Sequence, residues 1–213
     1  MPAKNTLKIY ADNGYYHLYN RGVERRNIFL CSEDYLTLLH LIKTCLTGNP
    51  ISPNTSKSLQ GRLELLAFCL MPNHFHLLIK QNDKEAMTEF MRKVFTSYSM
   101  YFNKKYKRAG TLFESRYKAS LIDRPDYLLH LSRYIHHNPA NLLRRGQKLE
   151  DYPYSSLPNY LGHTNTDWGK TEEILNILKD EFGKRTTYKD FMKDTKIQSP
   201  FLAYENLTLE DYS

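Results

Sequence analysis

The sequence predicts an α+β fold in which an antiparallel or mixed β-sheet has helices packed on one face. Apolar runs of strand length alternate with longer segments whose apolar residues recur every three or four positions, which is typical of helices. These segments follow one another in the order β-α-β-β-α-β-α, and split β-α-β units of this kind predict a ferredoxin-like sandwich. The length of 213 residues suits one well-buried domain with an appendage, or two small domains.

The first strand is expected over residues 15–20, where β-prone side chains alternate before a turn. Ser32 is expected to cap the first helix, in which apolar residues recur at helical spacing. Gly48-Asn49-Pro50 stops this helix. The segment 51–60 is rich in Ser, Asn, Thr and Pro, which predicts an exposed loop.

Two apolar strands are expected next, over residues 63–70 and 74–80, with a turn between them that makes a hairpin. A long helix then runs from Lys84 to about Tyr106, because its apolar residues share one side, and Ala109-Gly110 breaks it.

A further strand is expected over residues 117–122, and Asp123 and Pro125 start a helix over 126–137. Pro139 ends or bends this helix, since proline removes a backbone donor. Two short helices are expected within 171–193. We therefore divide the chain into a domain over residues 1–165 and an extension of short helices and tail over 166–213.

The formal net charge of +7 favours an anionic partner, with nucleic acid first and a membrane surface second. Seventeen tyrosines, many close to Lys and Arg, suit a surface that stacks bases, although most single tyrosines are expected to be packing residues. The three cysteines lack metal-binding spacing and are expected to be reduced thiols. With no signal-type core and no apolar stretch long enough to span a membrane, we expect a cytoplasmic protein.

The stretch Met71-Pro72-Asn73-His74-Phe75-His76 carries two histidines around one apolar residue. In a strand, His74 and His76 point to the same face while Phe75 points to the other. Two adjacent imidazoles can bind a metal or a phosphate. The alternative is that they are ordinary polar residues on a solvated face.

The predicted helix over 126–137 places Tyr134 one turn before Asn138. Two imidazoles and one amide oxygen can ligate a divalent cation and leave open positions for a phosphate. The Tyr134 phenol is then placed to attack that phosphate, with the cation polarising it.

The chain resembles the single-tyrosine HUH transposases of the IS200-like family in two motifs. One is the His-hydrophobic-His motif after Met71-Pro72-Asn73, and the other is the segment 133–139. Within that family, the resemblance is closest to REP-associated tyrosine transposases. The segments that add to the resemblance are Asn20-Arg21-Gly22, Leu112-Phe113-Glu114-Ser115-Arg116-Tyr117, Tyr152-Pro153-Tyr154-Ser155-Ser156 and Tyr160-Leu161-Gly162. Together these motifs cover roughly residues 15–165, and their order and spacing are more specific than any one of them.

The resemblance implies a ferredoxin-like enzyme that cuts single-stranded DNA at the foot of a hairpin through a 5′-phosphotyrosine, in a step that can be reversed. Carried over by position, Tyr134 is the nucleophile, and His74, His76 and Asn138 hold Mg²⁺ or Mn²⁺. Asn in place of Gln at the third-ligand position is the REP-associated pattern, which implies a domesticated enzyme acting on palindromic repeats.

Basic residues are candidates for contacts to DNA phosphates, which supply affinity without sequence information. They are Arg21, Arg116, Lys118, Lys104, Lys105, Lys107 and Arg108. Arg116 and Lys118 are expected to share a face of one strand, and the basic end of the long helix is explained equally well by solvation and the helix dipole. His17, His136 and His137 could reach the site but are expected to be ordinary structural residues.

Three functions remain open. The first is a metal-dependent DNA-cleaving and strand-joining enzyme, which the set Tyr134, His74, His76 and Asn138 favours. The second is a catalytically idle protein that binds hairpin DNA as a repressor or architectural factor. The third is a small metal-binding protein with no DNA role, against which the positive charge weighs. A homodimer, with a site completed by two chains, is compatible with all of these.

Overall fold

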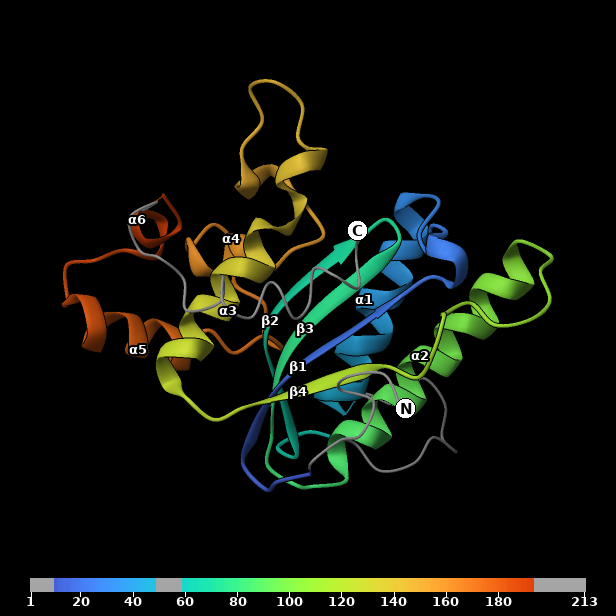
Figure 1. Cartoon of the computed structure of the whole chain (residues 1–213), viewed down its shortest axis with the longest axis horizontal. Coiled ribbons are helices and arrows are strands. Elements are labelled where there is room, and N and C mark those ends of the chain that lie inside the picture. Colours follow the sequence, from blue (N-terminus) through green and yellow to red (C-terminus); the bar gives the residue numbers. More distant parts are fainter. Residues whose placement is uncertain (1–9, 49–58, 194–213) are drawn as a thin grey trace.

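The computed structural model describes residues 10–48 and 59–193. Its centre is a four-stranded sheet in the order β2-β3-β1-β4 (Figure 1), and every neighbouring pair is antiparallel. The strands are β1 (Gly14–Arg21), β2 (Leu63–Met71), β3 (His74–Gln81) and β4 (Lys118–Ile122). The succession of elements and the strand order confirm the predicted α+β ferredoxin-like class.

Two long helices, α1 (Ser32–Thr47) and α2 (Ala86–Lys105), cover one face of the sheet. In Figure 1 α1 lies behind the strands and α2 extends to their right. The two helices enclose the larger core, to which Leu18, Phe75 and Leu77 of the strands contribute. Both helices are amphipathic, so their apolar sides are buried on the sheet and their polar sides face solvent.

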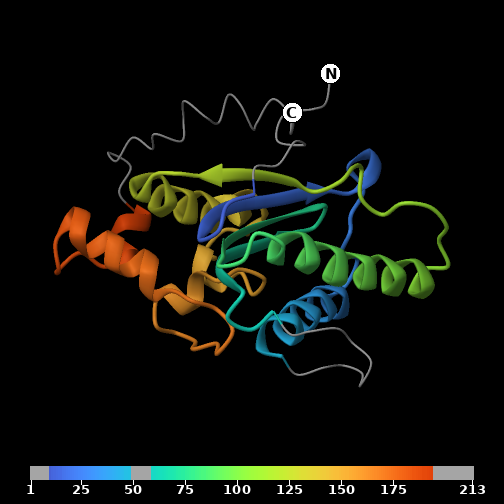
Figure 2. The same ribbon diagram turned by 90° about the horizontal axis from the view of Figure 1, so that it is seen from below.

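The other face of the sheet is covered as well, by α3 (Pro125–His137), α5 (Glu172–Phe182) and α6 (Tyr188–Lys193). These helices lie to the left of the strands in Figure 1, and Figure 2 shows α5 at the opposite end of the molecule from α1 and α2. The expectation of helices on one face therefore holds for α1 and α2 only. The physical reason is that β2 is apolar on both faces, with Leu65 buried toward α1 and α2 and Leu66 buried toward α3.

Short helical turns complete the described chain. They are η1 (Val23–Arg25), η2 (Asn138–Leu142), η3 (Leu149–Asp151) and α4 (Leu157–Tyr160). None of the described helices is long and apolar enough to cross a membrane.

The boundaries of two predicted helices differ from the observed ones. Cys31, not Ser32, precedes the first helical residue of α1, and the Asp34 carboxylate accepts hydrogen bonds from the Leu30 and Cys31 amides at 2.8 and 3.2 Å. The helix ends at Gly48, whose φ of 78° suits glycine. Helix α2 begins at Ala86, two residues after the predicted Lys84, and ends at Lys105, within one residue of the predicted Tyr106.

The loop predicted over 51–60 lies almost entirely outside the described residues, which resume at position 59. Residues 171–193 form the two predicted short helices. The division of the chain at residue 165 stays a prediction, and α5 and α6 share one core with α3.

The segment that follows α3 and η2 covers the outer edge of β2. Leu70 donates its amide hydrogen to the Tyr154 carbonyl at 2.9 Å, and Ser156 donates to the Phe68 carbonyl at 3.0 Å. The Tyr152 hydroxyl donates to the Leu70 carbonyl at 2.6 Å. The motif Tyr152–Ser156 thus protects an edge strand that would otherwise expose unpaired backbone groups.

Glycine is required at position 22 because the chain turns back on it after β1 and brings Arg26 close to its backbone. A Cβ at Gly22 would lie 2.2 Å from the Arg26 carbonyl oxygen. The Gly22 amide donates to the Asn73 carbonyl at 2.8 Å, and the Ile28 amide donates to the Pro72 carbonyl at 2.8 Å. This contact holds the turn that immediately precedes the histidine pair.

Candidate metal and nucleophile site

The histidine pair lies at the start of β3 on the face that α3 covers. His76 is buried and lies opposite Tyr19 of β1, while Phe75 points into the core under α1 and α2. The rings of His74 and His76 have centroids 5.1 Å apart and nearly perpendicular planes. The predicted placement of both imidazoles on one face is therefore confirmed.

Helix α3 brings Tyr134 to these histidines. Pro125 at the first helical position and Asp126 in the first turn begin the helix, and Pro139 follows its end. The Tyr134 ring meets His76 edge-on, with centroids 5.6 Å apart and planes at 84°. A residue more than fifty positions away in the sequence thus lies beside the histidine pair.

Asn138 caps the C-terminus of α3, where its side-chain nitrogen donates to the Tyr134 carbonyl at 3.0 Å. A hydrogen bond also joins its side chain to His74. The four residues predicted for the site, His74, His76, Tyr134 and Asn138, are therefore together at one place on the sheet.

Both imidazoles are held in the neutral form that a metal ligand needs. Burial lowers the pKa of His74 to about 4, and the hydrogen bond with Asn138 only partly opposes this effect. Burial also lowers the pKa of His76, and the electrostatic effect of the neighbouring His17 and His74 lowers it further. On its other side, the His74 Nδ1 lies 2.7 Å from the Asn73 side-chain oxygen.

His17 belongs to this group, although its expected role was structural. It lies on β1 two residues before Tyr19, and its Nε2 is 2.9 Å from the His76 Nδ1. Its ring also meets the Tyr134 ring edge-on at 6.3 Å. The sequence signal was the alternation of β1, which places His17 and Tyr19 on one face, but only the register of β1 with β3 shows which face that is.

Two of the predicted DNA contacts border the site. Lys118 opens β4 with its ammonium group 5.7 Å from the centre of the Tyr19 ring. Arg21 lies opposite His74 in the β1–β3 register and forms an ion pair with Glu114 at 3.0 Å. Cationic side chains thus stand next to the histidine pair.

The remaining predicted DNA contacts lie elsewhere. Arg116 is exposed and precedes β4, which begins at Lys118, so the expectation that both share a strand face is wrong. Lys105 binds within the protein, with its Nζ 2.8 Å from the Asp34 carboxylate. The basic end of α2 lies at the far right of Figure 1, away from α3. DNA contacts by Lys104, Lys105, Lys107 and Arg108 stay a prediction.

The histidines after Tyr134 have structural partners, as expected. His136 is fully buried, and its two ring nitrogens lie 2.8 Å from the Tyr188 hydroxyl and 2.8 Å from the Ser156 hydroxyl. The His137 Nε2 lies 3.0 Å from the Met192 carbonyl oxygen. Both residues fasten α3 to the chain that follows it.

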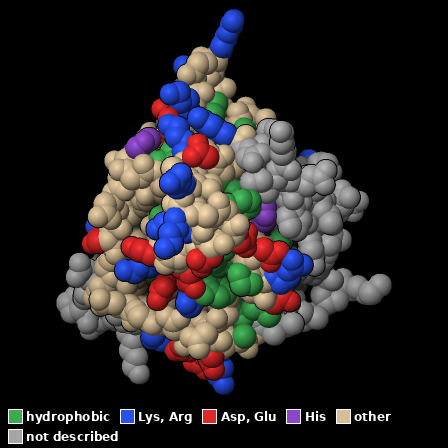
Figure 3. Space-filling model, turned by 90° about the vertical axis from the view of Figure 1, so that its left-hand side faces the viewer, with side chains coloured by type: hydrophobic (Ala, Val, Ile, Leu, Met, Phe, Trp, Pro, Cys, Tyr) green, Lys and Arg blue, Asp and Glu red, His purple; other side chains and the backbone are tan. Residues whose placement is uncertain are grey.

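Further basic side chains follow α3 and were not among the predicted contacts. Arg144, Arg145 and Lys148 are exposed between η2 and η3. In Figure 3, Lys and Arg side chains gather toward the top of this side of the molecule, whereas Asp and Glu mix with them lower down. This gradient places positive charge on the side of the molecule where α3 ends.

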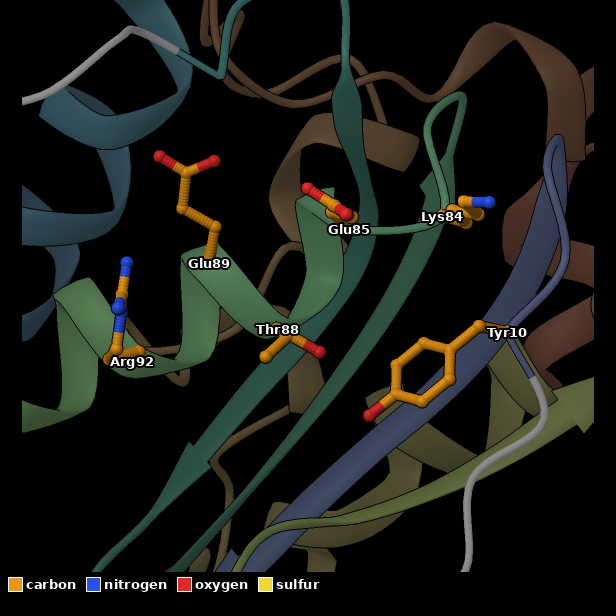
Figure 4. Close-up of a pocket in the computed structure, with 6 residues that line it drawn as sticks. All are labelled: Tyr10, Lys84, Glu85, Thr88, Glu89 and Arg92. Carbon is orange, nitrogen blue, oxygen red and sulfur yellow. The ribbon is translucent and has the colours of Figure 1, made fainter.

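A separate hollow of about 470 Å³ lies beside the start of α2 (Figure 4). It is lined by Tyr10, Lys84, Glu85, Thr88, Glu89 and Arg92. These residues carry both signs of charge and include no predicted site residue. The hollow is therefore not part of the candidate site.

Among residues 10–48 and 59–193, no three His, Cys, Asp or Glu side chains cluster as a metal site would require. A site built on His74 and His76 therefore needs a third ligand of another kind. The Asn138 amide is next to His74 and has an oxygen of the type that hard divalent cations bind.

A known protein family matches the part of the chain that contains these residues. Residues 54–138 match the family model described as transposase IS200-like. This segment is similar to IS200-like transposases. The matched segment includes His74, His76, Tyr134 and Asn138, so these four residues of the candidate site fall within it. No curated protein matches the chain.

Solved structures resemble this chain in fold. One is described as a REP-associated tyrosine transposase bound to a REP hairpin. It is 18% identical, covers 77% of this chain and 95% of its own, and has a TM-score of 0.56. A second, described as a putative transposase from Deinococcus radiodurans, is 18% identical, covers 67% of this chain and 92% of its own, and has a TM-score of 0.38. The first supports the fold.

Proposed function

We propose that the protein is a metal-dependent endonuclease and strand transferase that cuts single-stranded DNA near a hairpin or palindrome, with Tyr134 as nucleophile. The observation that carries this proposal is the edge contact between the Tyr134 and His76 rings, 5.6 Å between centroids. It brings a phenol beside two neutral imidazoles, in a segment that matches the IS200-like transposase family model. The hairpin bound by the structurally similar protein makes hairpin DNA the first substrate to test.

The ligand set fits a divalent cation that accepts nitrogen donors. We infer that His74, His76 and Asn138 hold it, with two imidazole nitrogens and one amide oxygen. Mg²⁺ favours oxygen ligands, whereas Mn²⁺ binds imidazole more readily, so we expect Mn²⁺ to bind more tightly than Mg²⁺. When bound, the cation polarises the scissile phosphate and neutralises charge that develops on it.

Tyr134, which lies beside these proposed ligands, carries out the cleavage step. The Tyr134 oxygen loses its proton and attacks the phosphorus, and the bond from phosphorus to the 3′ oxygen breaks. The products are a 5′-phosphotyrosine and a DNA strand whose 3′ oxygen takes up a proton. Attack by a 3′ hydroxyl on the phosphotyrosine reverses the step and joins strands. Lys118 and Arg21 stand where they can attract the DNA backbone.

Such a substrate agrees with the net charge of +7 and with the expectation of a cytoplasmic, nucleoid-associated bacterial protein. Asn138 as third ligand favours the REP-associated subgroup and a domesticated role. A homodimer stays a prediction, because the site residues described above all come from one chain.

The test is formation of a covalent adduct between the full chain and a labelled single-stranded hairpin in Mn²⁺ or Mg²⁺, followed on a denaturing gel. We expect an adduct with the wild type, and none with Tyr134→Phe, which removes only the attacking oxygen. Hairpin binding should change less than about threefold, because the ring and its packing remain.

Tyr19→Phe is the matched control, since it removes a hydroxyl from the same sheet face without touching the proposed nucleophile. An adduct with Tyr134→Phe would refute the nucleophile assignment. Hairpin binding by the wild type without any adduct would support the alternative, a catalytically idle binder that acts as repressor or architectural factor.

A further inference from the structure

His17 is buried against His76, and the proposed cleavage step gives this contact no role. The two rings are almost fully buried, with exposed fractions of 3% for His17 and 1% for His76. The His17 Nε2 lies 2.9 Å from the His76 Nδ1, and the ring planes differ by only 18° with centroids 5.1 Å apart. Near-coplanar rings at this separation meet nitrogen to nitrogen rather than face to face.

This hydrogen bond restricts which nitrogen of His76 can bind a metal. A neutral imidazole carries its proton on one nitrogen and a lone pair on the other, and a metal takes the lone pair. If the His76 Nδ1 donates to His17, the His76 Nε2 keeps its lone pair for the metal. If His17 donates instead, the proton of His76 sits on Nε2, where it blocks ligation.

We propose that His17 is a positioning residue that accepts a hydrogen bond from the His76 Nδ1 and thereby holds His76 in the tautomer that ligates through Nε2. The inference rests on the metal site of the proposed function. Metal-binding histidines are usually held in this manner by a carboxylate or a backbone carbonyl. Here a neutral ring takes that place and adds no negative charge to the site.

The uncharged ligand set has a consequence for affinity. The proposed ligands and His17 are all uncharged, so they place no negative charge on the cation. The scissile phosphate supplies that charge, and we expect divalent cations to bind the protein more tightly when hairpin DNA is present.

The test compares two replacements of His17 in the full chain. His17→Phe keeps a ring but cannot accept a hydrogen bond, whereas His17→Gln offers an amide oxygen as acceptor. Mn²⁺ binding is measured by electron paramagnetic resonance with Tyr134→Phe as background, which prevents DNA cleavage. We expect the Mn²⁺ affinity to fall about 10- to 100-fold in His17→Phe and to recover to within a few-fold of the wild type in His17→Gln.

His130→Phe is the matched control, because His130 is a buried histidine of α3 whose Nδ1 has no partner among the described atoms. We expect it to leave the Mn²⁺ affinity unchanged. Thermal melts confirm that each variant is folded. An unchanged affinity in folded His17→Phe, or no recovery in folded His17→Gln, overturns the inference.

A second readout needs no metal. Nitrogen-15 NMR of the imidazoles should show the His76 proton on Nδ1 in the wild type and a mixture of tautomers in His17→Phe. A His76 proton found on Nε2 in the wild type overturns the role of His17. Wild-type protein that shows this tautomer but binds no Mn²⁺ would instead refute the metal site of the proposed function, so the two failures are distinguishable.

Discussion

At the scale of single residues, the candidate site depends on side chains that are kept neutral by burial. Burial lowers the pKa of His17 to about 3 and that of His74 to about 4. Imidazoles with these values present lone pairs rather than positive charge at neutral pH. The positive charge of the site is therefore left to Lys118 and Arg21 at its border.

Asp34 shows the opposite balance at the start of α1. Burial alone raises the pKa of its carboxyl, but hydrogen bonds from Lys105, the Leu30 amide, Tyr106 and Tyr101 outweigh burial and lower the pKa to about 2. The carboxylate both caps α1 and receives the ammonium group of Lys105, which lies at the end of α2. It therefore ties together the two helices that cover one face of the sheet.

Asp34→Asn should lower the free energy of unfolding at pH 7 by about 1–3 kcal/mol, since the buried charged hydrogen bonds are lost. Because the pKa in the folded state lies below that of the unfolded chain, this contribution is complete above about pH 4 and disappears as the pH falls toward 2. Urea unfolding of wild type and variant at several pH values measures the difference.

Glu33→Gln is the control for this prediction, because Glu33 pairs with the same Lys105 but is 69% exposed. It should cost no more than about 0.5 kcal/mol. Equal losses in the two variants would show that the buried position of Asp34 does not matter.

At the scale of elements, the candidate site depends most on α3, because this helix carries Tyr134 and Asn138 follows its last residue. The helix is fastened by His136, whose Nδ1 lies 2.8 Å from the Tyr188 hydroxyl of α6. The same hydroxyl is 2.8 Å from the Ser132 hydroxyl. The short helix α6 therefore holds two turns of α3 in place over the sheet.

Tyr188→Phe should lower the free energy of unfolding by about 1–3 kcal/mol, since it leaves a buried imidazole nitrogen without its partner. It should also reduce adduct formation more than hairpin binding, because Tyr134 loses its fixed position beside His76. Tyr160→Phe is the matched control: its hydroxyl donates to the Leu66 carbonyl of β2 at 2.8 Å and makes no bond to α3. Equal effects of both variants on adduct formation would contradict this positioning role of α6.

At the scale of the whole molecule, one sheet separates two cores. The core under α1 and α2 and the core under α3, α5 and α6 share β2 and β3, whose residues alternate between them. Trp168, the single tryptophan, follows α4 but stacks on Phe68 of the first core, with centroids 5.5 Å apart. Each core thus borders chain segments that belong to the other.

We therefore expect the two cores to unfold together. Leu178→Ala removes a fully buried side chain of α5 in the second core and should cost about 2–5 kcal/mol. The midpoint of Trp168 fluorescence, which reports on the first core, should fall as far as the midpoint of circular dichroism. Leu36→Ala, at a 60% exposed position of α1, should change neither midpoint. A fluorescence midpoint that stays fixed in Leu178→Ala would show independent unfolding.

The sequence by itself predicted the succession of strands and helices along the chain and the four residues that the structure brings together beside β3. Local periodicity carries this information: alternation places His74 and His76 on one face of β3, and helical spacing places Tyr134 one turn before Asn138. The ferredoxin-like class follows from the order of elements, because short connections leave few ways to pair the strands.

Only the tertiary structure decided which face of the sheet receives α3. The apolar runs of β2 and β3 are compatible with cover on either face, so the sequence left the second layer of helices undetected. The partnership of His17 with His76 was hidden for the same reason. It depends on the register between β1 and β3, which joins residues 59 positions apart and is set by packing of the whole sheet rather than by any local pattern.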